Sequence, residues 1–198
     1  MTTIRLATEH DAEGVLAIYT PVVLETPISF EIEPPDAEEM RGRIRKALTS
    51  HVWLVCESDA GEVLGYVYGG KIRERFAYQW STEVTAYVHP KAYRGGVGRA
   101  LYTSLFAVLR LQGYYNAFAG IAMPNDASVG LHKAVGFEYI GVYHRIGYKF
   151  GRWHDVSWWE RSLQAHDTEP TTPQPVETLL DHAEWQAAVQ AGLPLLHI

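Results

Sequence analysis

The sequence predicts one α/β domain built on a mixed sheet, and three features of the chain lead to this prediction. Apolar and polar residues alternate along 82–88, a glycine-rich turn follows at 94–98, and apolar side chains then recur at helical spacing over 97–109. Two apolar runs, 52–57 and 63–70, are joined by a short glycine-containing turn, which predicts a β-hairpin. Strand-like and helix-like segments continue to alternate up to residue 163, as they do in α/β folds.

Composition narrows the class of protein. The chain has 198 residues with 47% hydrophobic content, enough for one sizeable core. A net charge of −6 argues against nucleic-acid binding, which needs a clustered basic face. The sequence has neither a signal-peptide pattern nor an apolar run of about 18 residues, so no membrane association is expected. The single cysteine, Cys56, excludes an intrachain disulfide, and the cytoplasm is the expected location.

The first part of the chain predicts a strand, two helices and a loop between them. Residues 4–7 suit a short strand, and Thr8 is a suitable N-cap for a helix whose end is disturbed by Pro21. Residues 26–35 are expected to form an extended loop. Asp36 begins a segment that resembles a capping box, which predicts the start of a second helix.

Start and stop signals also predict the elements from residue 82 onward. Pro90 ends the strand at 82–88 because proline cannot donate a ladder hydrogen bond, and Gly113 is well placed to end the helix that begins at Val97. The next predicted elements are a strand at 116–122, a helix at 126–135, and two long strands at 137–146 and 154–163.

The chain is expected to divide into a domain at 1–164 and a tail at 165–198. Residues 165–175 are polar and contain prolines, which is typical of an extended linker. Residues 176–191 carry enough apolar side chains for a helix, and Pro194 prevents much continuation. The tail can dock on its own subunit, dock on a partner, or stay mobile.

A strand that runs through a glycine turn into a helix is suited to binding an anion. The first N–H groups of the helix have no intrahelical partner and carry the positive end of the helix dipole. Glycines let a pyrophosphate approach the main chain. The segment lacks the three spaced glycines of a dinucleotide-binding fingerprint and the Gly-Lys-Ser/Thr of a Walker loop. Taken alone, it is equally compatible with a tight turn that binds nothing.

Three separated motifs resemble those of the GNAT N-acetyltransferases. The segment Tyr93-Arg94-Gly95-Gly96-Val97-Gly98 is similar to the family's coenzyme A pyrophosphate loop, with tyrosine at the first position where the family has Gln or Arg. Residues 125–137 resemble the second cofactor motif, with His132 where most members carry tyrosine. Residues 147–156, and the Trp-x-x-Glu at 80–83, resemble the phosphinothricin acetyltransferase subgroup. The resemblance spans roughly residues 2–163 and implies the GNAT acyl-CoA N-acyltransferase fold, a mixed, mostly antiparallel sheet flanked by helices.

The resemblance implies an acetyl-CoA-dependent enzyme that acetylates the α-amine of a small amino acid analogue such as phosphinothricin, methionine sulfone or methionine sulfoximine. It therefore also implies herbicide resistance. Direct transfer in a ternary complex needs a base, because an α-amino group with a pKa of about 8 is largely protonated at neutral pH. Glu83 matches the subgroup's catalytic glutamate, and the alternative is a structural carboxylate paired with an arginine. His132 is the second catalytic candidate, to protonate or orient the leaving thiolate, with Tyr87 or a water as alternatives.

The resemblance also implies the binding residues. For acetyl-CoA they are the strand residues Thr85, Ala86, Tyr87 and Val88, which can pair with the pantetheine arm; the loop residues Tyr93, Arg94, Gly95, Gly96, Val97 and Gly98; and Asn125 and Ser128. For the acceptor they are Phe30, Arg75, Arg73 as a second choice, and Tyr78. An arginine suits a carboxylate because its planar fork can hold both oxygens. For Phe30 the alternative is simple core packing, and for each arginine a surface salt bridge.

Three further expectations complete the interpretation. No metal is expected, because the histidines have no ligand-spaced partners. A homodimer is expected from the resemblance, with Trp158 and Trp159 as candidates for its interface. Two rival functions stay open: acetylation of a different amine, such as a polyamine or a protein N-terminus, and a non-catalytic module that senses acetyl-CoA or serves as an interaction scaffold. Arginines near the acceptor argue against a polyamine, which would need an acidic pocket.

Overall fold

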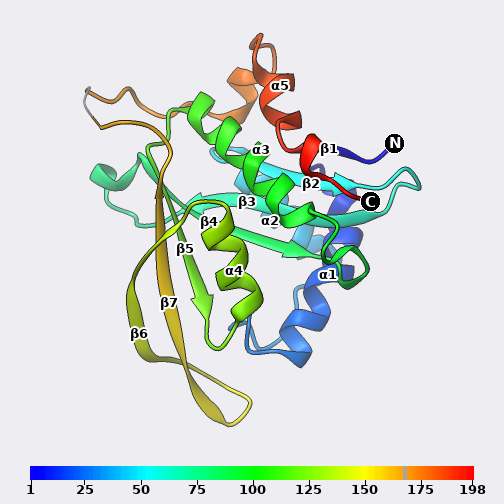
Figure 1. The fold of residues 1–198 in the computed structure, drawn as a ribbon, viewed down its shortest axis with the longest axis vertical. Coiled ribbons are helices and arrows are strands. Elements are labelled where there is room, and N and C mark those ends of the chain that lie inside the picture. The colour runs from blue at the N-terminus through cyan, green and yellow to red at the C-terminus, as the bar shows by residue number, and fades with distance from the viewer. Residues whose placement is uncertain (167–168) are drawn as a thin grey trace.

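The computed structural model describes residues 1–166 and 169–198. It contains a seven-stranded sheet in the order β1-β2-β3-β4-β5-β7-β6, with helices on both faces (Figure 1). The strands are β1 (Thr3–Leu6), β2 (Trp53–Glu57), β3 (Val63–Lys71), β4 (Ser81–Val88), β5 (Asn116–Ala122), β6 (Glu138–Lys149) and β7 (Arg152–Ser162). The helices are α1 (Ala12–Glu25), α2 (Ala37–Leu48), α3 (Val97–Gln112), α4 (Asp126–Ala134) and α5 (Trp185–Gln190), joined by short 3-10 turns. Among the described strands, β4 and β5 are the one parallel pair, which confirms the mixed, mostly antiparallel sheet.

Each face of the sheet has its own hydrophobic core. On one face, α3 packs through residues such as Val97, Leu101 and Leu105, all fully buried. On the other face, α1 and α2 pack on the β2–β3 hairpin, with Val15 and Ile44 at 0% exposure. Because side chains alternate along a strand, one set of β4 residues faces α3 and the other set faces α1 and α2.

Local signals in the sequence place most element boundaries correctly. Asp36 caps α2, since its side chain accepts a hydrogen bond from the Glu39 N–H at 2.8 Å. Gly113 ends α3 in the left-handed conformation, with φ of 93°. Gly61 has φ of 81° in the turn between β2 and β3, which pair antiparallel as the hairpin prediction required.

Two local predictions were wrong. Pro21 does not disturb the end of α1, which continues to Glu25. The proline ring is exposed, so water can reach the carbonyl that loses its partner, while Val23 beyond it is fully buried and holds the last turn. The helix expected over 176–191 is split into a 3-10 turn, Val176–Leu179, and α5. Between them His182 Nδ1 accepts the Glu184 N–H, a local bond that competes with a continuous helix.

The tail docks on its own subunit. Val176, Leu179, Trp185 and Val189 are buried in the core cluster that contains α3. The connection is fixed as well, because the Gln174 N–H donates to the Gln112 carbonyl at 2.7 Å. Residues 167 and 168 of the expected linker lie outside the described residues. In Figure 1 the tail crosses the outer side of α3 and ends near the start of that helix.

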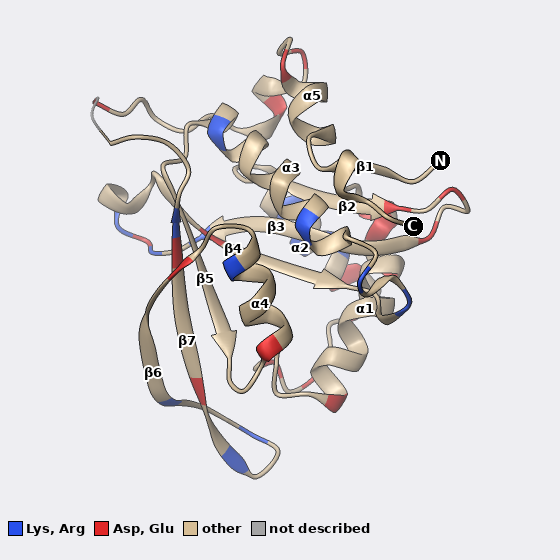
Figure 2. Cartoon of the chain, in the orientation of Figure 1, with Lys and Arg blue, Asp and Glu red and all other residues tan. Residues whose placement is uncertain are grey.

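Charged positions are dispersed over the fold. Figure 2 shows acidic and basic residues interspersed on the helices and strands, and basic residues near the β6–β7 turn. Over residues 1–166 and 169–198, no helix is long and apolar enough to cross a membrane.

Candidate functional site: a split strand pair beside an aromatic cavity

Strands β4 and β5 separate after a short parallel contact. Their pairing covers Ser81–Asn116, Thr82–Ala117 and Glu83–Phe118, after which the two strands diverge. On its other side β4 continues to pair with β3 as far as Val88. The β5-facing edge of the predicted cofactor residues Thr85, Ala86, Tyr87 and Val88 is therefore available to an extended ligand that carries amide groups.

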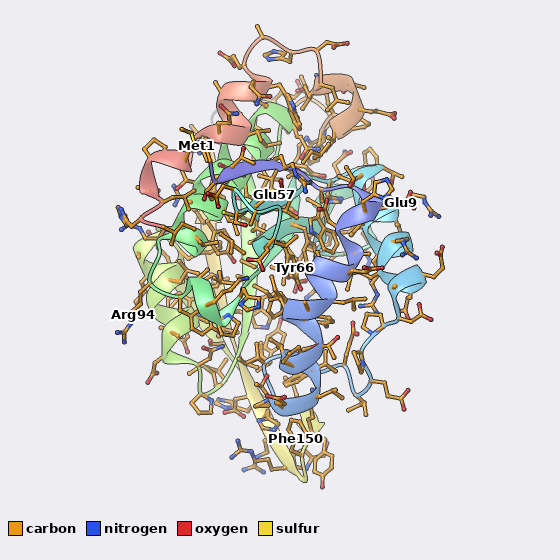
Figure 3. The ribbon with its side chains drawn as sticks, turned by 90° about the vertical axis from the view of Figure 1, so that its right-hand side faces the viewer. Met1, Glu9, Glu57, Tyr66, Arg94 and Phe150 are labelled. Carbon is orange, nitrogen blue, oxygen red and sulfur yellow. The ribbon has the colours of Figure 1, made fainter. Side chains whose placement is uncertain are left out.

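The glycine turn sits at the mouth of this split. Tyr93 and Arg94 are exposed, and Figure 3 shows Arg94 at the outer margin of the molecule. Gly96 is the N-cap of α3 with φ of 80°, and no side chain caps the helix. The N–H groups of the first turn, beginning at Val97, have no carbonyl within the helix to receive them. These features fit a pyrophosphate, because the loop combines glycines, which have no side chain to block an approaching anion, with N–H groups that have no partner in the helix.

The second predicted cofactor motif forms the start of α4. The Asn125 side chain accepts the Ser128 N–H at 3.1 Å and so caps the helix. Leu131 of α4 packs against Gly98, where an added Cβ would lie 2.9 Å from the leucine side chain. The structure thus packs the helix of the second cofactor motif against the first turn of α3.

His132 is held inside the protein rather than in the open split. It is 6% exposed, and its Nδ1 lies 2.7 Å from the Ser128 carbonyl oxygen. A carbonyl can only accept, so Nδ1 carries the proton and Nε2 accepts from the Tyr102 hydroxyl at 2.9 Å. Burial lowers the pKa of His132, which favours the neutral ring. Both ring nitrogens therefore contact protein groups.

Glu83 lies on the opposite face of β4 from the α3 core, in register with Gly70 of β3. It is half-buried, and burial raises the pKa of its carboxyl group, while the charge of Arg73 opposes that rise. Within the described part of the chain, the carboxylate makes no hydrogen bond and no ion pair. The geometry thus lacks the arginine partner that a structural carboxylate would have.

An aromatic wall lies on the same face as Glu83. Tyr87 of β4 contacts Tyr66 and Tyr19, with ring centroids 5.5 and 5.3 Å apart. Trp53 stacks on Tyr68 at 4.3 Å. Figure 3 shows Tyr66 near the middle of the molecule, beside α1. Such surfaces bind the carbon skeleton of a small ligand while a few polar groups orient it.

Tyr19, Trp53, Tyr66 and Tyr68 of this wall line a cavity of about 760 Å³, and Tyr87 lies outside its lining. Its lining includes Tyr19, Met40, Arg43, Trp53, Tyr66, Tyr68, Gly70, Lys71, Glu74, Tyr78 and Ser81. Glu83 is not part of the lining, but Gly70 and Ser81, its partner and near neighbour, are. Of the four residues predicted to bind the acceptor, the cavity includes Tyr78.

The other three predicted acceptor residues occupy different positions. Phe30 packs against Gly147 and lies 6.1 Å from the His154 ring. Arg73 is exposed and close enough to influence the charge of Glu83. Arg75 is exposed and forms no ion pair with any described residue. Arg73, the second choice from sequence, is thus the arginine whose charge lowers the pKa of Glu83.

One residue that matters for this site has no obvious signal in the sequence. Lys149 is 5% exposed, and its Nζ donates to the carbonyl oxygens of Val23 and Ser29 at 2.6 and 2.7 Å. These bonds fix the loop that carries Phe30 to the β6–β7 hairpin. The sequence does not reveal this role, because both partners of Lys149 lie more than a hundred residues away along the chain.

The structure offers no metal site in its described residues, since no three His, Cys, Asp or Glu side chains gather there.

Comparisons with known proteins agree with this geometry. Residues 4–158 match the family model "Acetyltransferase (GNAT) domain". The chain is 40% identical over 167 residues to a phosphinothricin N-acetyltransferase of Streptomyces coelicolor, covering 81% of this chain and 95% of that protein. It is 33% identical over 168 residues to an L-methionine sulfoximine/L-methionine sulfone acetyltransferase of Pseudomonas aeruginosa, covering 84% and 98%.

A solved structure shows the same fold with its ligand. A GNAT superfamily phosphinothricin acetyltransferase from Sinorhizobium meliloti, in complex with acetyl-CoA, superimposes with a TM-score of 0.82 at 32% identity, covering 86% of this chain and 93% of that one. The split between β4 and β5, the glycine turn and the family match together account for acetyl-CoA as the acetyl donor. The chain belongs to the GNAT acetyltransferase family and is an acetyl-CoA-dependent N-acetyltransferase.

Proposed function

We propose that the protein acetylates the α-amine of a small amino acid analogue, of the phosphinothricin, methionine sulfone or methionine sulfoximine kind. The observation that carries the proposal is the unpaired, half-buried carboxylate of Glu83 beside an aromatic cavity, with Arg73 close by. The names of the relatives point to the same acceptors. A cationic polyamine would meet the positive charge of Arg73 and fits less well.

Glu83 serves as the general base. Acetyl-CoA supplies a reactive thioester, so the protein has to align the amine and remove its proton. Glu83 takes that proton, directly or through water, and its raised pKa brings it closer to the range where a carboxylate is an effective base. The amine nitrogen then forms its bond to the acetyl carbon, which gives a tetrahedral intermediate. The carbon–sulfur bond breaks, and the nitrogen loses its second proton to water to leave the neutral amide; water in turn reprotonates the acid that serves the thiolate. Backbone N–H groups near Tyr87 and Val88, at the edge facing β5, stabilise the negative charge on the carbonyl oxygen.

The proton for the departing thiolate comes from Tyr87 in this proposal. Burial raises the pKa of Tyr87 well above its ordinary value, so its phenol stays protonated. Its hydroxyl forms no hydrogen bond with the described residues, whereas both nitrogens of His132 are engaged. His132 then acts as a positioning residue that holds α4 to Tyr102 of α3.

Thiol release from acetyl-CoA tests the proposed acceptor class. We expect rapid release with at least one of methionine sulfone, methionine sulfoximine and phosphinothricin, and only background release with spermidine. Equal or faster release with spermidine would contradict the proposal. Binding of acetyl-CoA without release on any acceptor would favour the non-catalytic alternative.

We also propose that two copies associate through the β6–β7 hairpin, in the cytoplasm. Trp159 is buried in the core, but the hairpin exposes Tyr148 and Trp153 on one face and Tyr143 on the other, by 46–60%. Strand β6 forms an edge of the sheet, and a long apolar edge is normally covered. Light scattering is expected to give twice the mass of one chain, and a monomer at micromolar concentration would contradict this.

A further inference from the structure

The tail extends beyond the family match, which ends at residue 158, and returns to the glycine turn. We call residues 192–198 the strap. Its start is fixed, because the Gly192 N–H donates to the Ser104 hydroxyl of α3 at 3.0 Å. An added Cβ on Gly192 would collide with the carbonyl of Ala100, so the strap runs against the α3 backbone itself. Its course toward the turn is therefore set by α3.

The strap contacts both glycines that precede α3. The His197 N–H donates to the Gly95 carbonyl oxygen at 2.9 Å. An added Cβ on Gly95 would collide with the Ile198 side chain, and one on Gly96 with the Leu195 carbonyl. Gly95 is buried as a result. Because the two glycines have no side chains, they leave room for the strap, and they also allow the backbone conformation of the turn.

The atoms that the strap uses are not the ones an anion needs. The strap bonds to a carbonyl oxygen, whereas the N–H groups of the first turn of α3 stay available for a pyrophosphate. A few residues further on, Gly98 packs against Leu131 of α4. The turn is therefore held between the strap and α4, and Figure 1 shows these two elements on different sides of the start of α3.

We propose that the strap is a positioning element of the coenzyme loop, which fixes Gly95 and Gly96 in the conformation that binds the pyrophosphate of acetyl-CoA. A glycine-rich turn loses much conformational entropy when it is ordered. Contacts that order it before the ligand arrives reduce that cost and strengthen binding. The inference rests on the use of acetyl-CoA and not on the proposed acceptor.

Replacing His197 with proline tests the bond to Gly95 in the full chain. Proline removes the single backbone donor, and Leu196 before it already has φ of −78° and ψ of 137°, which a residue preceding proline favours. His197→Ala is the matched control, because it removes the imidazole but keeps the N–H. Titration calorimetry with coenzyme A needs no acceptor, so its outcome is independent of the proposed function.

We expect His197→Pro to weaken coenzyme A binding about tenfold, as loss of one ordering hydrogen bond allows, with His197→Ala close to wild type. The KM for acetyl-CoA is expected to rise while kcat at saturation is unchanged, and the melting temperature is expected to fall by no more than about 5 °C. Unchanged affinity in His197→Pro would overturn the proposal. So would tighter binding, which would mean that the strap covers the site, or equal weakening in both variants, which would assign the effect to the imidazole.

Discussion

Glu83→Gln is expected to lower kcat at neutral pH by roughly 100- to 10,000-fold, the range associated with loss of a general base. Glutamine keeps the shape of the side chain but cannot take a proton from the ammonium group. The defect is expected to shrink at alkaline pH, because an amine above its own pKa of about 8 no longer needs a base. Steady-state rates between about pH 5 and 10 measure this. Full activity at pH 7, or a defect that is the same at every pH, would contradict the role of Glu83.

The pH dependence of the rate in matched variants distinguishes the role of Glu83 from the roles of the residues around it. Burial raises the pKa of Glu83 and the charge of Arg73 lowers it, so the rate should rise with pH as the carboxyl group loses its proton. Arg73→Met removes the opposing charge and is expected to move this acid limb to higher pH. Arg75→Met makes the same change of charge and should leave the limb in place. Tyr87→Phe is expected to lower kcat without moving the limb, because the phenol stays protonated throughout.

Lys149→Met is expected to reduce the free energy of unfolding by about 2–4 kcal/mol. Methionine fills the space of the stem, but the carbonyl oxygens of Val23 and Ser29 lose their buried donor. The melting temperature should fall by roughly 5–15 °C. The loop that carries Phe30 loses its attachment to the β6–β7 hairpin, so the KM for the acceptor should rise while coenzyme A affinity is retained. Calorimetric melting and a KM series measure the two effects.

Lys91→Met is the control for charge. Lys91 is exposed and pairs with exposed Glu62 at 2.5 Å, so its loss should change stability by less than about 1 kcal/mol. If Lys149→Met had the same melting temperature as Lys91→Met and kept the wild-type KM for the acceptor, the proposed attachment of the loop would be wrong.

Local signals account for the parts of the fold that the sequence predicts well. Asp36 at the start of α2 and Gly113 at the end of α3 act on their own backbone neighbours, so a short segment of sequence is enough to predict their effect. The glycine turn before α3 can be predicted from the sequence for the same reason. The family motifs supply the remaining part of the cofactor site, because they join residues that local patterns cannot relate.

Long-range contacts account for what the sequence does not reveal. The path of α1 through Pro21 depends on burial of Val23 by other elements. His132 meets Tyr102, thirty positions earlier in the chain, and that bond engages the Nε2 atom of its imidazole. Lys149 and the strap likewise depend on partners that only the folded chain brings near. The aromatic cavity follows from the register of β2, β3 and β4, which sequence periodicity alone does not fix.

The acceptor assignment is tested most directly by the same reaction run in competition. Methionine sulfone and spermidine are supplied together at equal concentration with a limiting amount of acetyl-CoA, and the products are identified by mass spectrometry. We expect N-acetylmethionine sulfone, modified at its α-nitrogen, as the main product, and its loss in Glu83→Gln at pH 7. Acetylspermidine as the main product, or consumption of acetyl-CoA with neither amine modified, would contradict it.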